Sequence, residues 1–236
     1  MTKKTGEEAA KTGATLEPAP GASAERAAHW QRVYQDKSET QVSWFEESPA
    51  LSLQLIAAAG FGPVKADTDA VDIGGGGARL VDALLRDGYR SVTVLDISAA
   101  ALAVAQRRLQ ADADLRQLAD RVTWVSADVT RWRPERQYDL WHDRAALHFL
   151  TDPADQAAYR ATLLAALRPG GVAIIGTFAP DGPERCSNLP VQRYDAASLA
   201  RLLGADFTLL TSCRHDHATP RGSVQHFQFS SFRRRR

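Results

Sequence analysis

The hydrophobic positions of this 236-residue chain follow two alternating patterns. Short apolar runs rich in β-branched residues predict strands, and between them lie longer segments whose apolar residues recur every three to four positions, as in amphipathic helices. The predicted strands are residues 70–73, 91–96, 122–126, 138–142, 172–178, 207–211 and 223–232. A regular alternation of strands and helices predicts an α/β fold built on a parallel sheet.

The end of the chain departs from this alternation. Only about eleven residues separate the last two predicted strands, and no helical pattern lies between them. Such neighbours pair as an antiparallel hairpin, because a parallel connection needs a longer crossover. We therefore expect a doubly wound, mostly parallel sheet of seven strands with an antiparallel terminal strand. Helix boundaries are predicted at Ser48-Pro49, Gly60, Ser98, Asp152-Pro153, Asp195 and Gly204.

Composition divides the chain into a tail and one domain. Residues 1–25 contain almost no large apolar side chains and predict a disordered tail. Residues 26–236 are expected to form a single domain, in which an α/β core (63–236) follows a helical segment (26–62). That segment is rich in aromatic residues. It can either pack on the edge of the sheet or form a lid over a ligand, and the sequence leaves both possibilities open.

Charge argues against nucleic acid or a membrane as partner, and the cysteine content indicates the compartment. A net charge of +1 gives no overall field that would attract nucleic acid or a membrane surface, and no apolar run reaches membrane-spanning length. Cys186 and Cys213 are expected to be free thiols in a reducing, cytoplasmic setting. The basic residues 233–236 are expected to be a solvated, frayed end. The oligomeric state is not predicted.

Four consecutive glycines, residues 74–77, connect the first predicted strand to a helix. Glycine lets a ligand approach the backbone closely, and the free N–H groups at a helix N-terminus favour electron-rich ligand atoms. Asp96 ends the next strand, about 20 residues further on, where a carboxylate suits the hydroxyls of a ribose. The combination predicts a nucleoside site; the alternative is a tight turn that binds nothing.

Residues 70–180 resemble the class I S-adenosylmethionine-dependent methyltransferases. The resemblance depends on five motifs in the usual order, namely Val71–Gly76, Val94–Asp96, Ala127–Val129, Tyr138–Leu140 and Leu167–Gly171. It implies a Rossmann-like methyltransferase fold, S-adenosylmethionine as cofactor, and methyl transfer by direct in-line displacement to a small molecule or a protein side chain. The remaining segments look similar to a bacterial branch of small-molecule and lysine methyltransferases. One departure is Ala78, which stands where the family usually has a third glycine.

The same resemblance suggests which residues contact the cofactor. Asp72, Gly74 and Gly76 would lie near its amino-acid portion. Asp96, with Ile97 beside it, would hold the ribose hydroxyls. The cofactor contacts are completed by Asp128 at the adenine amino group, Val129 beside the adenine ring, and Trp30 and Tyr34 from the N-terminal helical segment.

The acceptor is expected at the end of the fourth strand. His142 and Asp143 are candidates for a general base or for orienting the acceptor, although they can equally bond neighbouring backbone and close the loop. Trp44, Arg144 and Phe178 are expected to contact the acceptor. The Asn/Asp-Pro-Pro-aromatic motif is absent there, which argues against methylation of nucleobases or glutamine.

Two other functions and a metal site remain as alternatives. A non-catalytic nucleoside-binding protein would share most of these motifs. A NAD-dependent oxidoreductase would share the sheet, but the chain has no Tyr-x-x-x-Lys pair. A metal site can be drawn from Cys213, His215, His217 and His226. Hydrogen-bonded histidines are favoured over it, and no metal is assigned.

Overall fold

The computed structural model describes residues 20–61 and 65–236. It contains a seven-stranded sheet in the order β3-β2-β1-β4-β5-β9-β8. The strands are β1 (Asp69–Ile73), β2 (Ser91–Asp96), β3 (Val122–Ser126), β4 (Tyr138–Arg144), β5 (Leu167–Phe178), β8 (Phe207–Ala218) and β9 (Val224–Arg234). β9 pairs antiparallel with both β5 and β8, and the pairs among β1 to β5 are parallel. The predicted fold class is confirmed.

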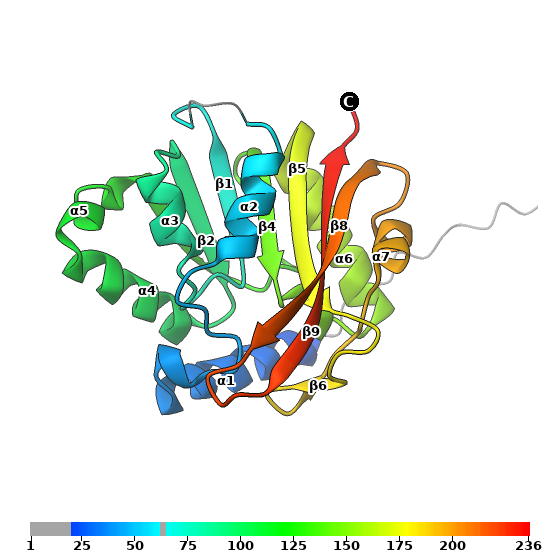
Figure 1. Ribbon diagram of the computed structural model, residues 1–236, viewed down its shortest axis with the longest axis horizontal. Helices are drawn as coiled ribbons and strands as arrows, with labels where there is room; N and C mark the ends of the chain where they lie inside the picture. The colour runs from blue at the N-terminus through cyan, green and yellow to red at the C-terminus, as the bar shows by residue number, and fades with distance from the viewer. Residues whose placement is uncertain (1–19, 62–64) are drawn as a thin grey trace, which may run out of the picture.

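Helices cover both faces of the sheet, and α1 lies across the carboxyl ends of its parallel strands (Figure 1). The α-helices are α1 (Pro20–Asp36), α2 (Ala50–Ala58), α3 (Leu80–Arg86), α4 (Ala99–Ala111), α5 (Ala113–Arg116), α6 (Pro153–Ala166) and α7 (Ala196–Leu203). Three 3-10 turns are η1 (Glu39–Gln41), η2 (Ala119–Arg121) and η3 (Leu147–Phe149). Side-chain caps form where predicted at Ser98, Asp152 and Asp195, whereas the N-cap position of α2 is Pro49, which makes no side-chain cap hydrogen bond.

Two apolar cores explain why the chain folds around this sheet. Side chains of α2, α3 and α4 pack on one face against residues such as Val94 of β2. Side chains of α6 and α7 pack on the other face against residues such as Ile73 of β1. β1 is buried along its whole length, as expected for a central parallel strand.

Three details differ from the sequence-based expectations. Residues 1–19 of the expected tail lie outside the described residues, but residues 20–25 belong to α1. The basic C-terminus was expected to be frayed, but it is ordered up to Arg234. This residue lies in β9 and donates a hydrogen bond to the carbonyl of Leu164 at 2.7 Å. A short hairpin of β6 (Arg185–Cys186) and β7 (Leu189–Pro190) was not predicted, because two-residue strands are too short to show a period. No helix in the described part of the chain is long and apolar enough to cross a membrane.

Candidate active site

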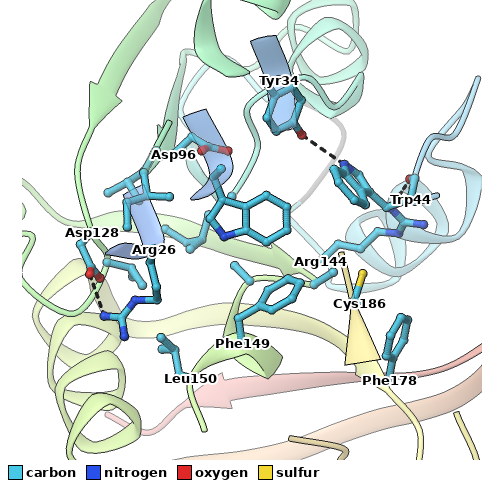
Figure 2. Close-up of a pocket in the computed structure, with 18 of the residues that line it drawn as sticks. Arg26, Tyr34, Trp44, Asp96, Asp128, Arg144, Phe149, Leu150, Phe178 and Cys186 are labelled. Carbon is cyan, nitrogen blue, oxygen red and sulfur yellow. Dashed lines mark hydrogen bonds and ion pairs between the residues drawn. The ribbon is translucent and has the colours of Figure 1, made fainter. Parts of the chain in front are cut away.

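A pocket of about 840 Å³ opens where α1 faces the carboxyl ends of β1 to β5. Figure 2 shows its two ends. We call one the acid end, lined by Arg26, Asp96, Ile97, Asp128 and Val129. We call the other the aromatic end, lined by Trp44, Arg144, Phe149, Phe178 and Phe227.

A second pocket of about 630 Å³ adjoins the first at the glycine turn. Its lining includes Ser52, Asp72, Gly75 and His142. The residues that line both pockets are Tyr34, Trp44, Ile73, Gly74 and Arg144, so the two pockets meet there. A ligand with an adenosine part and an amino-acid part can therefore extend from the acid end, past Gly74, into the second pocket.

The glycine turn brings two carboxylates unusually close to the backbone. Gly74 has a φ of +68°, a conformation that favours glycine. A Cβ on Gly75 would lie 2.4 Å from Asp72 Oδ2, and one on Gly76 would lie 2.5 Å from Asp96 Oδ2. Side chains at these positions would displace the carboxylates. Ala78, by contrast, is not among the residues with positive φ in the described part of the chain, so it replaces the usual glycine without backbone strain.

Asp96 is fixed by the backbone at the floor of the larger pocket. Its Oδ2 accepts a hydrogen bond from Gly76 N at 3.0 Å, and its Oδ1 accepts one from Ser98 N at 2.8 Å. Burial, which disfavours the charged form, raises the pKa of Asp96 to about 7. Each oxygen retains a second lone pair, so this carboxylate can still accept ligand hydroxyls.

At the acid end, Asp128 forms an ion pair with α1. Its Oδ2 lies 2.8 Å from Arg26 Nη2, and its Oδ1 accepts from Thr130 N at 2.9 Å. Arg26 also binds Asp155 of α6 at 2.6 Å. Burial raises the pKa of Asp128, but hydrogen bonds from Ser23, Arg26 and Thr130 outweigh burial and hold that pKa below its ordinary value. Arg26 was not predicted, because one arginine in an alanine-rich helix gives no sequence signal.

Neither candidate base reaches the larger pocket. His142 Nδ1 is 2.7 Å from Asp72 Oδ1 and its Nε2 is 2.9 Å from Ser52 Oγ, so both ring nitrogens are bonded at the second pocket. Asp143 lines neither pocket. Its Oδ1 accepts from Ala146 N at 2.9 Å and its Oδ2 accepts from Tyr159 Oη at 2.7 Å. Asp143 therefore has the loop-closing position considered in the sequence analysis, and its position does not support a role as base.

The aromatic end is built from segments far apart in the sequence. Trp44 Nε1 donates to Tyr34 Oη at 3.1 Å, and Arg144 Nη1 donates to Trp44 O at 2.8 Å (Figure 2). The guanidinium of Arg144 lies 5.2 Å from the ring centre of Phe227. Phe149 and Phe227 were missed in the sequence because each has the ordinary pattern of a core residue.

Within the described residues, Cys213, His215, His217 and His226 do not come together as the metal site drawn from the sequence. Burial raises the pKa of Cys186 to about 11, so its thiol stays protonated. His226 pairs with Asp216 at 2.7 Å, whereas His215 and His217 come within 4.8 Å of Glu46. Arg144 Nη2 lies 3.1 Å from Glu46 Oε1. The cluster of Glu46, His215 and His217 therefore already has a cationic side chain beside it, which disfavours a metal ion there.

The family comparison agrees with this geometry. Residues 70–171 match the family model described as a methyltransferase domain. The chain carries an S-adenosylmethionine-dependent methyltransferase domain. No curated protein sequence shows significant similarity to the chain.

Solved methyltransferases share the fold along almost the whole chain. The 1,6-didemethyltoxoflavin N1-methyltransferase of Burkholderia thailandensis, solved with bound 1,6-didemethyltoxoflavin and S-adenosylhomocysteine, is 25% identical, with a TM-score of 0.70, over 95% of this chain and 94% of that one. An S-adenosylmethionine-dependent methyltransferase of Anabaena variabilis is 13% identical, with a TM-score of 0.68, over 96% and 100%. The N-methyltransferase NodS of Bradyrhizobium japonicum is 15% identical, with a TM-score of 0.64, over 86% and 97%.

Proposed function

We propose that this methyltransferase binds S-adenosylmethionine across its two pockets and methylates a small molecule held at the aromatic end. The single observation that carries the proposal is the position of Asp96. Its carboxylate is held by Gly76 N and Ser98 N in a pocket that also contains the predicted adenine contacts Asp128 and Val129. A small molecule is favoured over a protein side chain because the acceptor space is enclosed by aromatic side chains.

The residues present fit this cofactor. The Cβ positions at Gly75 and Gly76 would overlap the two carboxylates, so the turn is built for close packing of backbone and acid. Ribose hydroxyls are donors that Asp96 can accept, and the adenine amino group is a donor for Asp128. Ile97 and Val129 offer apolar surface to the adenine ring. The amino-acid portion would lie near Asp72 and Gly74 in the second pocket.

The chain supplies orientation and a dry environment. Bound here, the cofactor provides a methyl group that its positively charged sulfur makes electrophilic. Holding an acceptor in line with that methyl group can be worth effective molarities of about 10⁵–10⁸ M. The carboxylates that line the larger pocket, Asp96 and Asp128, are both at the acid end within the described residues. In the part of the chain that the structure describes, no carboxylate of this pocket is therefore placed to remove a proton from the acceptor, so the acceptor must bind with a lone pair already available for methylation.

The proposal is tested by titration calorimetry with S-adenosylhomocysteine. Asp96→Ala is expected to weaken binding at least tenfold, because two ligand hydroxyls lose their acceptor. Asp120→Ala is the matched control, because Asp120 is an exposed carboxylate of η2 outside both pockets. Circular dichroism confirms that each variant is folded. If the wild-type chain does not bind S-adenosylhomocysteine, or if the Asp96 variant binds it normally, the proposal is wrong.

We place this enzyme in the cytoplasm. Cys186 and Cys213 are both free, as expected in a reducing compartment. Mass spectrometry of alkylated protein isolated from cells measures whether both thiols are reduced.

A further inference from the structure

Arg144 is a buried cation with an unsatisfied donor. Its Nη1 donates to Trp44 O at 2.8 Å and its Nη2 lies 3.1 Å from Glu46 Oε1. Its Nε is buried and has no hydrogen-bond partner among residues 20–61 and 65–236. A buried donor without an acceptor is costly, and Arg144 lines the pocket in which an acceptor would bind.

The two arginines of the larger pocket differ in how their charge is balanced. Arg26 is paired with two carboxylates, Asp128 and Asp155. Arg144 forms an ion pair with one carboxylate in the described part of the chain, that of Glu46. The nearby His217 adds no negative charge, and burial together with Arg144 lowers its pKa. An additional negative charge beside Arg144 would therefore be stabilised at the aromatic end. At the acid end, the charge of Arg26 is already balanced by its two carboxylates.

Aromatic side chains form much of the wall of the aromatic end. Arg144 stacks over Phe227, and Phe178 lies edge-on to Phe227 with ring centres 4.9 Å apart. The amide oxygen of Gln225 is also buried, with no hydrogen-bond partner among the residues that the structure describes, and Gln225 lines the same pocket. A ligand at this end thus meets aromatic surfaces, one unpaired donor and one unpaired acceptor.

We propose that the methyl acceptor is a flat aromatic or heteroaromatic molecule that binds as an anion, and that Arg144 selects its negative charge. This inference rests on the proposed function, because it assigns the acceptor of that same site. The acceptor carries an acidic N–H or O–H group conjugated with its ring, and Arg144 favours the deprotonated form. An N–H or O–H elsewhere on the ring donates to Gln225.

This assignment explains how the site can work without a base at its aromatic end. The acceptor loses its proton to solvent before it binds, since Arg144 stabilises the anion. The lone pair of the anion then forms the bond to the methyl carbon. The electron pair of the carbon–sulfur bond remains on sulfur. A negative acceptor and a positive donor thus give two neutral groups, and no further reactant is needed.

The test compares three probe molecules with the protein saturated by S-adenosylhomocysteine. The probes are 2-naphthoate (flat anion), 2-naphthylmethylammonium (flat cation) and cyclohexanecarboxylate (anion that is not flat). Quenching of tryptophan fluorescence measures binding. We expect 2-naphthoate to bind at least tenfold more tightly than the other two. Equal affinity for the two flat probes, or no binding of any probe to the saturated protein, would overturn the inference.

Variants of Arg144 test the residue itself. Arg144→Met should weaken 2-naphthoate at least tenfold, and Arg144→Lys should retain most of the preference for the anion. The control is Arg107→Met, an exposed arginine of α4. Unchanged binding of 2-naphthoate by a folded Arg144→Met protein contradicts the inference.

A spectroscopic reading separates charge selection from a merely structural role. The absorbance of bound 4-nitrophenol reports its own pKa, which should be lower on the wild-type protein than in water. Arg144→Met should abolish that shift, whereas Arg107→Met should keep it. Failure of the wild-type protein to bind S-adenosylhomocysteine would instead refute the proposed function, so the two failures are distinguishable.

Discussion

Arg26 Nη2 lies 2.8 Å from Asp128 Oδ2 and thereby ties α1 to the loop after β3. Both side chains are largely buried, with 16% and 6% of their surface exposed. The same helix places Trp30 and Tyr34 in the lining of the larger pocket. Of the two arrangements considered for the N-terminal segment, α1 therefore has the position of a cover over the pocket.

Replacing Arg26 is predicted to loosen this cover. Arg26→Met leaves Asp128 and Asp155 without their shared cation, and hydrogen bonds to charged groups are each worth about 1.5–3 kcal/mol. We expect about tenfold weaker binding of S-adenosylhomocysteine and faster hydrogen exchange in residues 20–36. Arg32→Met, an exposed arginine in the same helix, is the control. Unaltered exchange in the Arg26 variant would show that the ion pair does not hold α1 in place.

Cofactor affinity is predicted to depend on pH through Asp96. Its pKa is about 7, raised by burial, and only the ionised carboxylate accepts from two hydroxyls. Affinity for S-adenosylhomocysteine should thus be highest above pH 7 and fall as pH falls through 7. Calorimetry between about pH 5.5 and 8.5 measures this. Asp96→Asn should bind weakly at every pH, and a wild-type affinity that is flat across the range argues against the assigned contact.

The same group is predicted to affect stability in the opposite sense. A carboxyl group whose pKa is raised on folding binds protons more tightly in the folded than in the unfolded chain. The contribution of Asp96 to the free energy of unfolding should therefore decline as pH rises from about 4 to about 7. Urea denaturation of the wild-type chain and Asp96→Asn at pH 5 and pH 8 tests this. The variant should gain stability relative to the wild type at the higher pH, and the reverse order would contradict the buried position.

A methyl group on the glycine turn is predicted to disturb the ribose contact. The Cβ of Gly76→Ala would lie 2.5 Å from both Asp96 Oδ2 and Ala101 Cβ, so something must shift. We expect binding of S-adenosylhomocysteine to weaken at least tenfold in calorimetry. Gly21→Ala is the control, because a Cβ there meets nothing within 4 Å and alanine favours the helix. Normal binding by the Gly76 variant would mean that the turn yields without moving Asp96.

His142 is predicted to matter for stability rather than for acceptor binding. His142→Ala leaves Asp72 Oδ1 and Ser52 Oγ without their shared partner in a buried site. We expect the free energy of unfolding to fall by about 2–4 kcal/mol in urea titrations. Affinity for 2-naphthoate should change less than twofold. His226→Ala removes an exposed ion pair between β9 and Asp216 of β8 and should have a smaller effect on stability. Abolished probe binding in a stable His142 variant would restore a direct role for this residue.

The sheet could be predicted from the sequence because the hydrophobic periods of strands and helices are local patterns. The glycine turn and Asp96 also follow from local chemistry, and they lie together as expected. Arg26 and Phe227 could not be predicted, since each acquires its role only when a distant segment packs beside it. The sequence likewise could not show that Asp143 accepts a hydrogen bond from the hydroxyl of Tyr159, sixteen positions away, because that contact forms only when α6 packs on the sheet.

The position of β9 has a consequence for synthesis of the chain on the ribosome. β9 pairs with β5 on one side and with β8 on the other, although β8 precedes it in the sequence. β8 therefore has no partner in the sheet until residues 224–234 have emerged. Phe227 and Gln225 complete the aromatic end at that same moment. A nascent chain can thus assemble its acid end early, but it gains a binding surface for its acceptor only with the final strand.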